Sequence, residues 1–295
     1  MTTHLAIAKN STPEDDQLET FQEVNNEEEI SHEVTLFAEP VFHIGSFNVT
    51  NSLINTWLVV IFFIIFSLIF RKRISKIPKG VQNWAERIVE AALDLADSVT
   101  HDRKKSERFF PLVFGLFLFI LVNNWFGLIP GVGSIGMLQE HDGAQVFVPF
   151  FRGGTADLNT TLALAIFSIL LTHLAGIFFV GTWRYINRYI NINALLEIPK
   201  KILKEPSIIF VNPIKFFVGI VEVIGEVSKT ASLALRLFGN IFAGEVLLVS
   251  ISSLFAFFAP VPFLYLELFV GALQAVVFSI LVLVFFTIAT TEEEH

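Results

Sequence analysis

The sequence contains no cysteine, which excludes disulfide bonds, thiolate metal sites and cysteine nucleophiles. It also lacks a phosphate-binding Gly-Lys loop, so we expect the chain alone to catalyse no nucleotide reaction. The first residues have neither the basic nor the apolar segment of a cleavable signal peptide, and no basic face indicates a nucleic-acid partner. Nothing in the sequence requires a metal or a cofactor.

Apolar residues dominate what is present. They make up 53% of the 295 residues, and the mean hydropathy of +0.64 lies well outside the usual range of soluble domains. Apolar runs long enough to cross roughly 30 Å of hydrocarbon occur at 53–70, 109–129, 161–183 and 264–289. A fifth run, 208–254, contains several charges. We therefore predict an all-α polytopic membrane protein with about five membrane-crossing helices.

The distribution of charge predicts the orientation of the chain. Residues 1–40 are rich in acids with Lys9 as the only base, so we expect a flexible extracytoplasmic tail ahead of a membrane domain at 41–295. Basic clusters follow the first run ("RKRISKIPK" and "HDRKKSER") and the third run ("WRYINRY" and "PKKILK"). The positive-inside rule places these clusters and the C-terminus in the cytoplasm and the N-terminus outside. Between the first two clusters, "VQNWAERIVEAALDLADSV" predicts an amphipathic helix on the cytoplasmic surface.

One arginine lies inside an apolar segment, "SLALRLFGNIFAGE" at 232–245. Arg236 keeps its charge at every physiological pH, and a central arginine costs about 2.5–3.5 kcal/mol on translocon scales, so it needs a partner. At about 100° per residue, five residues fall within about 40° of its direction: Glu222, Lys229, Ser232, Asn240 and Ala243. No acid on its own helix is placed to neutralise it. The partner is expected on another helix, as a structural ion pair, or on another chain.

Several stretches resemble subunit a of the F-type ATP synthase, in the order of that family. They are "EPVFHIGSFNVTNSL" (39–53), "NNWFGLIPG" (123–131), "TADLNTTLALA" (155–165), "SLALRLFGNIFAGE" (232–245) and "LQAVVFSILVLVF" (273–285). The resemblance covers the chain after the acidic tail, and the arginine segment is its most specific part. It implies a non-catalytic subunit of the bacterial cell membrane whose two aqueous half-channels pass protons to and from the c-ring carboxylates. Its partners would be the c-ring, the b subunits of the peripheral stalk and the complete ATP synthase.

The resemblance gives Arg236 a partner in trans. In the family the arginine faces the ion-carrying carboxylate of each c subunit, so Arg236 would keep that carboxylate ionised and separate the two half-channels. Glu245 and Glu267 match positions of ionisable groups in the outer half-channel, where many members have a histidine at one of the two. Gln274 and Asn240 match positions near the arginine. Without the resemblance these two amides are more typical of hydrogen bonds between helices.

Further polar residues lie toward the two ends of this path. Residues that could line the outer water entrance are Asn123, Asn124, Arg152, Asp157 and Asn159. Asp157 could instead cap the third membrane helix together with Asn159. Residues toward the cytoplasmic exit are Glu222, Glu226, Lys229 and Ser232. Glu226 and Lys229 could instead form only an i, i+3 ion pair, and His173 is interpreted as a polar residue satisfied within the bundle.

The residue numbers predict that the last two long helices form an antiparallel hairpin. Facing residues then have numbers with a constant sum, which is 510 for Arg236 with Gln274 and 512 for Glu245 with Glu267. Both pairs put the turn at 255–256, just before the two prolines of "APVP" (259–262). The final run must tilt in a bilayer core of roughly 30 Å, and the longer run before it must tilt more or extend into the cytoplasm. Thr230, where many family members have proline, favours a straighter helix below Arg236.

Two other functions remain as alternatives. A secondary transporter that binds an anionic substrate at Arg236 would favour broken helices in two similar halves, which the sequence does not contain. A passive scaffold would leave Arg236, Glu245 and Gln274 without a role. The coupled ion path is therefore the preferred interpretation.

Overall fold

The structure, a computed structural model, describes residues 37–141, 144–190, 208–255 and 258–291. Within these ranges five helices are long and apolar enough to cross a membrane. They are α2 (Asn51–Arg73), α4 (Arg103–Gly127), α5 (Leu158–Val180), α8 (Ile208–Leu254) and α9 (Pro260–Thr290). The predicted all-α class and its five apolar helices are confirmed. Most of the predicted acidic tail and the last four residues lie outside the described part, so the tail stays a prediction.

The smaller elements include one that was predicted and several that were not. α3 (Val81–Thr100) is the expected amphipathic helix, and its apolar residues Trp84 and Leu95 are exposed. A short helix, α6 (Thr182–Ile190), follows α5. The unexpected elements are the strands β1 (Pro40–Ile44), β2 (Phe47–Thr50), β3 (Gly136–His141) and β4 (Ala144–Pro149) and the 3-10 turns η1 (Val132–Ser134) and η2 (Gly154–Ala156). β1 pairs antiparallel with β2 across a two-residue turn in which Gly45 has a φ of +65°. β3 and β4 pair with each other as a separate unit.

Local side chains determine where the membrane helices begin. Thr50 caps α2, its side chain accepting from the backbone N–H of Leu53. Asp102 caps α4 in the same way. α9 begins at Pro260, where the missing N–H costs no intrahelical bond. The prediction that the prolines stand at a helix end is therefore confirmed.

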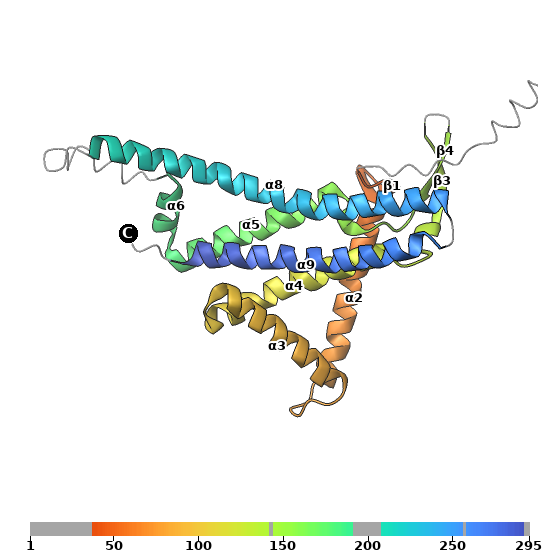
Figure 1. Cartoon of the computed structure of the whole chain (residues 1–295), viewed down its shortest axis with the longest axis horizontal. Coiled ribbons are helices and arrows are strands. Elements are labelled where there is room, and N and C mark those ends of the chain that lie inside the picture. Colours follow the sequence, from red (N-terminus) through yellow and green to blue (C-terminus); the bar gives the residue numbers. More distant parts are fainter. Residues whose placement is uncertain (1–36, 142–143, 191–207, 256–257, 292–295) are drawn as a thin grey trace, which may run out of the picture. The chain divides into compact units, whose positions relative to one another are not determined.

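The core lies between α4, α5, α8 and α9 (Figure 1). Its most deeply buried large side chains include Ile120 of α4, Leu237 of α8 and Leu283 of α9. Phe109 packs on Phe286 with ring centroids 5.0 Å apart. α2 differs from these helices because its buried residues all lie in its first nine positions, Asn51, Ser52, Asn55 and Val59. The four central helices therefore position the polar residues described below.

α8 and α9 run side by side in opposite directions (Figure 1), as predicted. The carboxyl of Glu267 lies directly against Gly244, at the place where a side chain on Gly244 would stand. These two numbers sum to 511, between the two sums predicted from the sequence. α8 continues through Thr230 and has 47 residues, or about 70 Å, so it must tilt in a core of roughly 30 Å or extend beyond it.

Gly127 provides a test of how the end of α4 is packed. A Cβ on Gly127 would lie 2.8 Å from the Cα of Gly153, a backbone atom that cannot move aside by itself. We expect Gly127→Ala to destabilise the protein by about 1–3 kcal/mol, the usual cost of overpacking. Gly115→Ala on the same helix is the matched control, because no atom lies within 4 Å of its Cβ position. Thermal unfolding of the purified complex measures both, and equal stabilities would contradict this packing.

Candidate functional site

Arg236 lies on an exposed face of α8. Its neighbours one turn before and one turn after it on that face, Ser232 and Asn240, are exposed too, as are Gly239 and Ala243. The opposite face is buried and consists of Leu233, Ala234, Leu237, Phe238 and Ile241. This division follows from the helical period, since residues 3 and 4 apart share a face. Within the described part of the chain, no hydrogen bond or ion pair joins Arg236 to another residue.

Gln274 of α9 occupies a different environment from the arginine. Its side chain is 8% exposed and lies on the buried face of α9, near Ala275 and Phe278. Among the described residues no hydrogen bond joins Gln274 or Asn240 to Arg236. The helix register brings α9 alongside this part of α8, but a direct role of either amide beside the arginine stays a prediction.

Glu245 binds a residue far away in the sequence. The guanidinium of Arg152 donates from Nε at 3.0 and 3.1 Å and from Nη2 at 2.9 Å to the two carboxylate oxygens of Glu245. Arg152 also donates to the backbone carbonyl of Phe37 at 3.2 Å, and its side chain is 5% exposed. The guanidinium thus binds the carboxylate in a bidentate way, and such a charge-assisted pair is stronger than a single hydrogen bond. Arg152 had been predicted only as a residue near the water entrance.

The sequence held one signal for this pair. Arg152 is the only base between residues 130 and 158, and Glu245 is an acid near the end of an apolar helix. Both were predicted to lie toward the same side of the membrane. The pair forms because the segment after β4 lies against α8, and no pattern in the sequence predicts this contact.

Glu267 is a buried carboxyl group at the α8–α9 contact. Its residue is 5% exposed, and its Oε1 has no hydrogen-bond partner in the described part of the chain. Gly244 makes room for it, because a side chain at that position would overlap the carboxyl. Glu245 directly follows Gly244 along α8, so it lies one residue from this contact. The structure therefore brings together the two acids that the sequence predicted as neighbours.

The ends of α4 and α5 contribute mostly structural hydrogen bonds. The side-chain amide of Asn124 donates to the carbonyl of Gly271 at 2.8 Å and accepts from the hydroxyl of Thr155, so it joins α4 to α9 and η2. Asp157 caps α5, accepting from the N–H of Asn159 at 3.1 Å. The capping interpretation of Asp157 is thus confirmed. Asn159 is exposed, and its place at a water entrance stays a prediction, as does that of Asn124.

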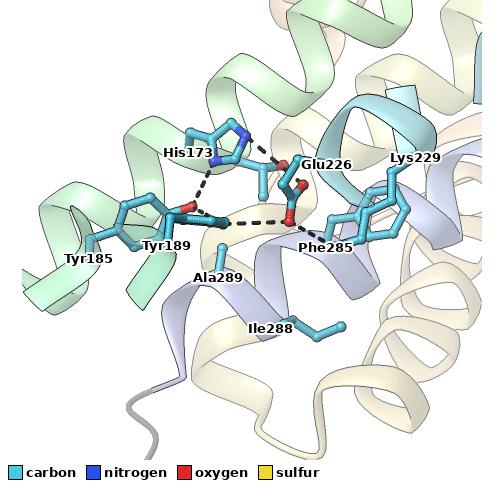
Figure 2. A pocket seen from close by; sticks show the side chains of 9 residues that line it. His173, Tyr185, Tyr189, Glu226, Lys229, Phe285, Ile288 and Ala289 are labelled. Carbon is cyan, nitrogen blue, oxygen red and sulfur yellow. Dashed lines mark hydrogen bonds and ion pairs between the residues drawn. The ribbon is translucent and has the colours of Figure 1, made fainter. Parts of the chain in front are cut away.

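A second group of polar residues surrounds a small cavity on the N-terminal side of Arg236 (Figure 2). We call it the inner cluster; its members are His173, Tyr185, Tyr189, Glu226 and Lys229. Lys229 donates to Glu226 at 2.7 Å, which confirms the predicted i, i+3 pair. The Nδ1 atom of His173 lies 2.8 Å from the Tyr185 hydroxyl, so His173 is satisfied within the bundle as expected. Glu222 is half-buried and does not line this site.

The two tyrosines of the inner cluster were missed. They stand four residues apart in "WRYINRY" and therefore share one face of α6. That segment was interpreted only as a basic cytoplasmic cluster. Spacing alone would have suggested the shared face, but not that α6 folds back on α5, where the ring of Tyr185 lies against Gly176.

The described residues contain no group of three or more histidines and acids suited to a metal ion. The candidate functional residues are instead an exposed arginine between two sets of ionisable side chains. On one side are Glu245 and Glu267, and on the other is the inner cluster. An arrangement of this kind can hold a fixed positive charge and exchange protons on both sides of it.

Known proteins resemble this chain over most of its length. Residues 53–287 match the family described as ATP synthase A chain. The protein named ATP synthase subunit a from Trichlorobacter lovleyi is 32% identical over 245 residues, which cover 83% of this chain and 89% of that relative. The protein of the same name from Geobacter sulfurreducens is 31% identical over 240 residues, covering 81% of this chain and 87% of that relative.

Proposed function

The chain belongs to the family of ATP synthase subunit a, and from this premise we propose that it forms the stationary ion path of a rotary ATP synthase. Membership in the family makes the chain a component of the ATP synthase membrane sector, with a part in ATP synthesis and proton transport. With its five long apolar helices it is a multi-pass membrane protein. Beyond this, we propose that the chain itself is non-catalytic and that it contacts a c-ring and the b subunits of a peripheral stalk.

The exposed face around Arg236 is the observation that most supports the proposal. A permanent charge on an apolar helix needs a counter-charge, and the described part of the chain offers none. A carboxylate on a second protein, presented beside Ser232, Arg236 and Asn240, would meet this need. Gly239 and Ala243 on the same face would let another helix approach closely, as small residues do at membrane helix contacts.

Protons would reach and leave that carboxylate through two half-channels. We assign the outer one to Glu245 and Glu267, with Gln274, Asn240, Asn124, Asp157 and Asn159 as further polar residues along it. The inner one would pass Ser232, Lys229 and Glu222 toward the cytoplasm. The charge of Arg236 would keep protons from moving directly between the two, since a guanidinium stays protonated and repels them. We also propose that the N-terminus lies outside a bacterial inner membrane, since the basic clusters of the sequence favour the cytoplasmic side.

The outer half-channel can be tested by measuring proton conduction. We expect Glu267→Gln and Glu245→Gln to slow the passive flow of protons through complexes stripped of their catalytic head, and the double variant to slow it more than either. The reason is that each carboxyl takes up and releases a proton, which an amide cannot do. Rates are normalised to assembled complex, because Glu245→Gln also removes the carboxylate that Arg152 binds.

Glu90→Gln supplies the matched control, because it makes the same chemical change at an exposed position on α3. It should conduct like the parent. Conduction that is indifferent to both outer carboxyls would contradict the assignment of the outer half-channel.

A further inference from the structure

The inner cluster is more connected than an isolated ion pair (Figure 2). We propose that it is a proton-transfer site in which one bound water joins Glu226 to His173, and that protons pass through it between the Arg236 face and the cytoplasmic surface. The inference deepens the proposed function and rests on it, because it needs a proton path on this side of Arg236. It assigns the inner half-channel to residues from three helices, α5, α6 and α8.

The hydrogen bonds of the inner cluster are compatible with one assignment of its hydrogens, which the proposal adopts. With Glu226 ionised, Lys229 and the Tyr189 hydroxyl both donate to its Oε1, at 2.7 and 3.5 Å. Since Tyr189 uses its only hydrogen there, Tyr185 donates to Tyr189 across 3.2 Å. The Tyr185 oxygen then accepts from Nδ1 of His173 at 2.8 Å. In this assignment neutral His173 carries its hydrogen on Nδ1, which leaves Nε2 as an acceptor toward Glu226.

This assignment makes two acceptors face each other. Nε2 of His173 and Oε2 of Glu226 are 4.0 Å apart, which is too far for a direct hydrogen bond and leaves both without a donor from the other. A cavity of about 20 Å³ adjoins them, lined also by Thr172, Phe285 and Ala289. One water needs roughly 10–15 Å³ of such space, so a single molecule fits. It can donate one hydrogen to each acceptor and satisfy both.

Such a water can move a proton without another reactant. An arriving proton binds to the water oxygen while the water gives one of its hydrogens to Nε2, and His173 becomes an imidazolium. Release toward the solvent breaks the same N–H bond and restores the neutral ring. One proton enters and one leaves. The carboxylate of Glu226 stays unchanged and stabilises the positive charge during the transfer.

The charges around the cavity favour this role. α8 contributes one acid and one base, Glu226 and Lys229, and α6 contributes two neutral tyrosines. The lining residues of α9 are apolar, among them Phe285, so α9 adds no charge there. The side chains of His173 and Glu226 are 30% and 18% exposed, so the site is sheltered but reachable. Tyr185 is a positioning residue, since its hydroxyl sets which nitrogen of His173 faces the water.

Passive proton conduction through head-stripped complexes in sealed vesicles tests the inference. We expect His173→Ala to slow conduction on the order of a hundredfold, the lower range for losing a positioned proton-transfer group. Glu226→Gln should slow it as well, because the imidazolium loses the carboxylate that stabilises its charge. Imidazole added on the cytoplasmic side should restore part of the rate of His173→Ala, because it can occupy the vacated space. Tyr185→Phe keeps the ring but loses the orienting hydroxyl, and should slow conduction several-fold.

The third tyrosine of the chain provides a matched control. Tyr265→Phe removes a hydroxyl from an exposed residue of α9 outside the inner cluster and should conduct like the parent. All variants are compared in complexes that retain the c-ring. If Glu226→Gln conducts like the parent while Glu267→Gln is slow, the inference is wrong and the proposed function stands. If both conduct like the parent, the proposed function fails too. A slow His173→Ala that imidazole does not restore would show a structural role and overturn the inference.

Discussion

Complexes that carry Arg236→Ala should assemble and yet make no ATP from a proton gradient. The fixed positive charge is needed each time a c-ring carboxylate passes, because it favours the ionised form of that carboxylate. Without this charge the two half-channels are also no longer separated. We expect coupled synthesis to fall to background and Arg236→Gln to behave alike, since an amide carries no charge. ATP synthesis by inverted vesicles, with the amount of complex measured in parallel, provides the readout.

Assembly should survive this change because of where Arg236 lies. Its side chain is exposed on α8 and makes no ion pair with a described residue, so replacing it removes no contact that holds this subunit together. Arg103→Ala is the matched control, an exposed arginine at the start of α4 that pairs with three acids on the protein surface. It should leave synthesis intact. Coupled synthesis at the parental rate in an assembled Arg236→Ala complex would refute the proposed function.

The second large effect is expected at the pair of Arg152 and Glu245. Arg152→Leu leaves the carboxylate of Glu245 without its cation in a site where its side chain is only 29% exposed. We expect a loss of about 3 kcal/mol, the lower end of the range for breaking a buried pair, because some solvent still reaches Glu245. Thermal unfolding of the purified complex and the yield of assembled subunit should both fall.

A double variant shows whether the stability loss of Arg152→Leu comes from the unpaired carboxylate or from lost packing. Arg152→Leu combined with Glu245→Gln removes the stranded charge, so much of the stability should return. Proton conduction should stay low in the double variant, because Glu245 is assigned to the outer half-channel. A double variant that is less stable than Arg152→Leu alone would contradict the view that the stranded carboxylate causes the loss.

Sequence reasoning succeeded where the physical cause was local. The fifth apolar run was bounded at 208–254 and α8 has the same bounds, because hydropathy along one helix is visible in one stretch of sequence. The start of α9 at Pro260 follows from the missing N–H of proline. The amphipathic period at 81–99 likewise predicted α3 to within one residue.

It failed where the cause lies in contacts between distant segments. Arg152 and Glu245 are 93 residues apart, and their pairing depends on the path of a loop that no periodic pattern describes. The β1–β2 hairpin was not predicted, although Gly45 stands at its turn with a positive φ. The tyrosines of α6 required the fold-back onto α5, which Gly176 permits.

The uneven burial of α2 has a consequence for how this family changes over time. Only its first nine residues contribute buried side chains, whereas later ones such as Phe62, Phe66 and Ile69 are half exposed. A surface that contacts only lipid or another apolar surface must be apolar but need not have a particular shape. Many different apolar sequences can therefore form it equally well. Asn51, Ser52 and Asn55, in contrast, fill a fixed space. Related chains should thus diverge freely along most of α2, and a low identity there says little about whether two of them work alike.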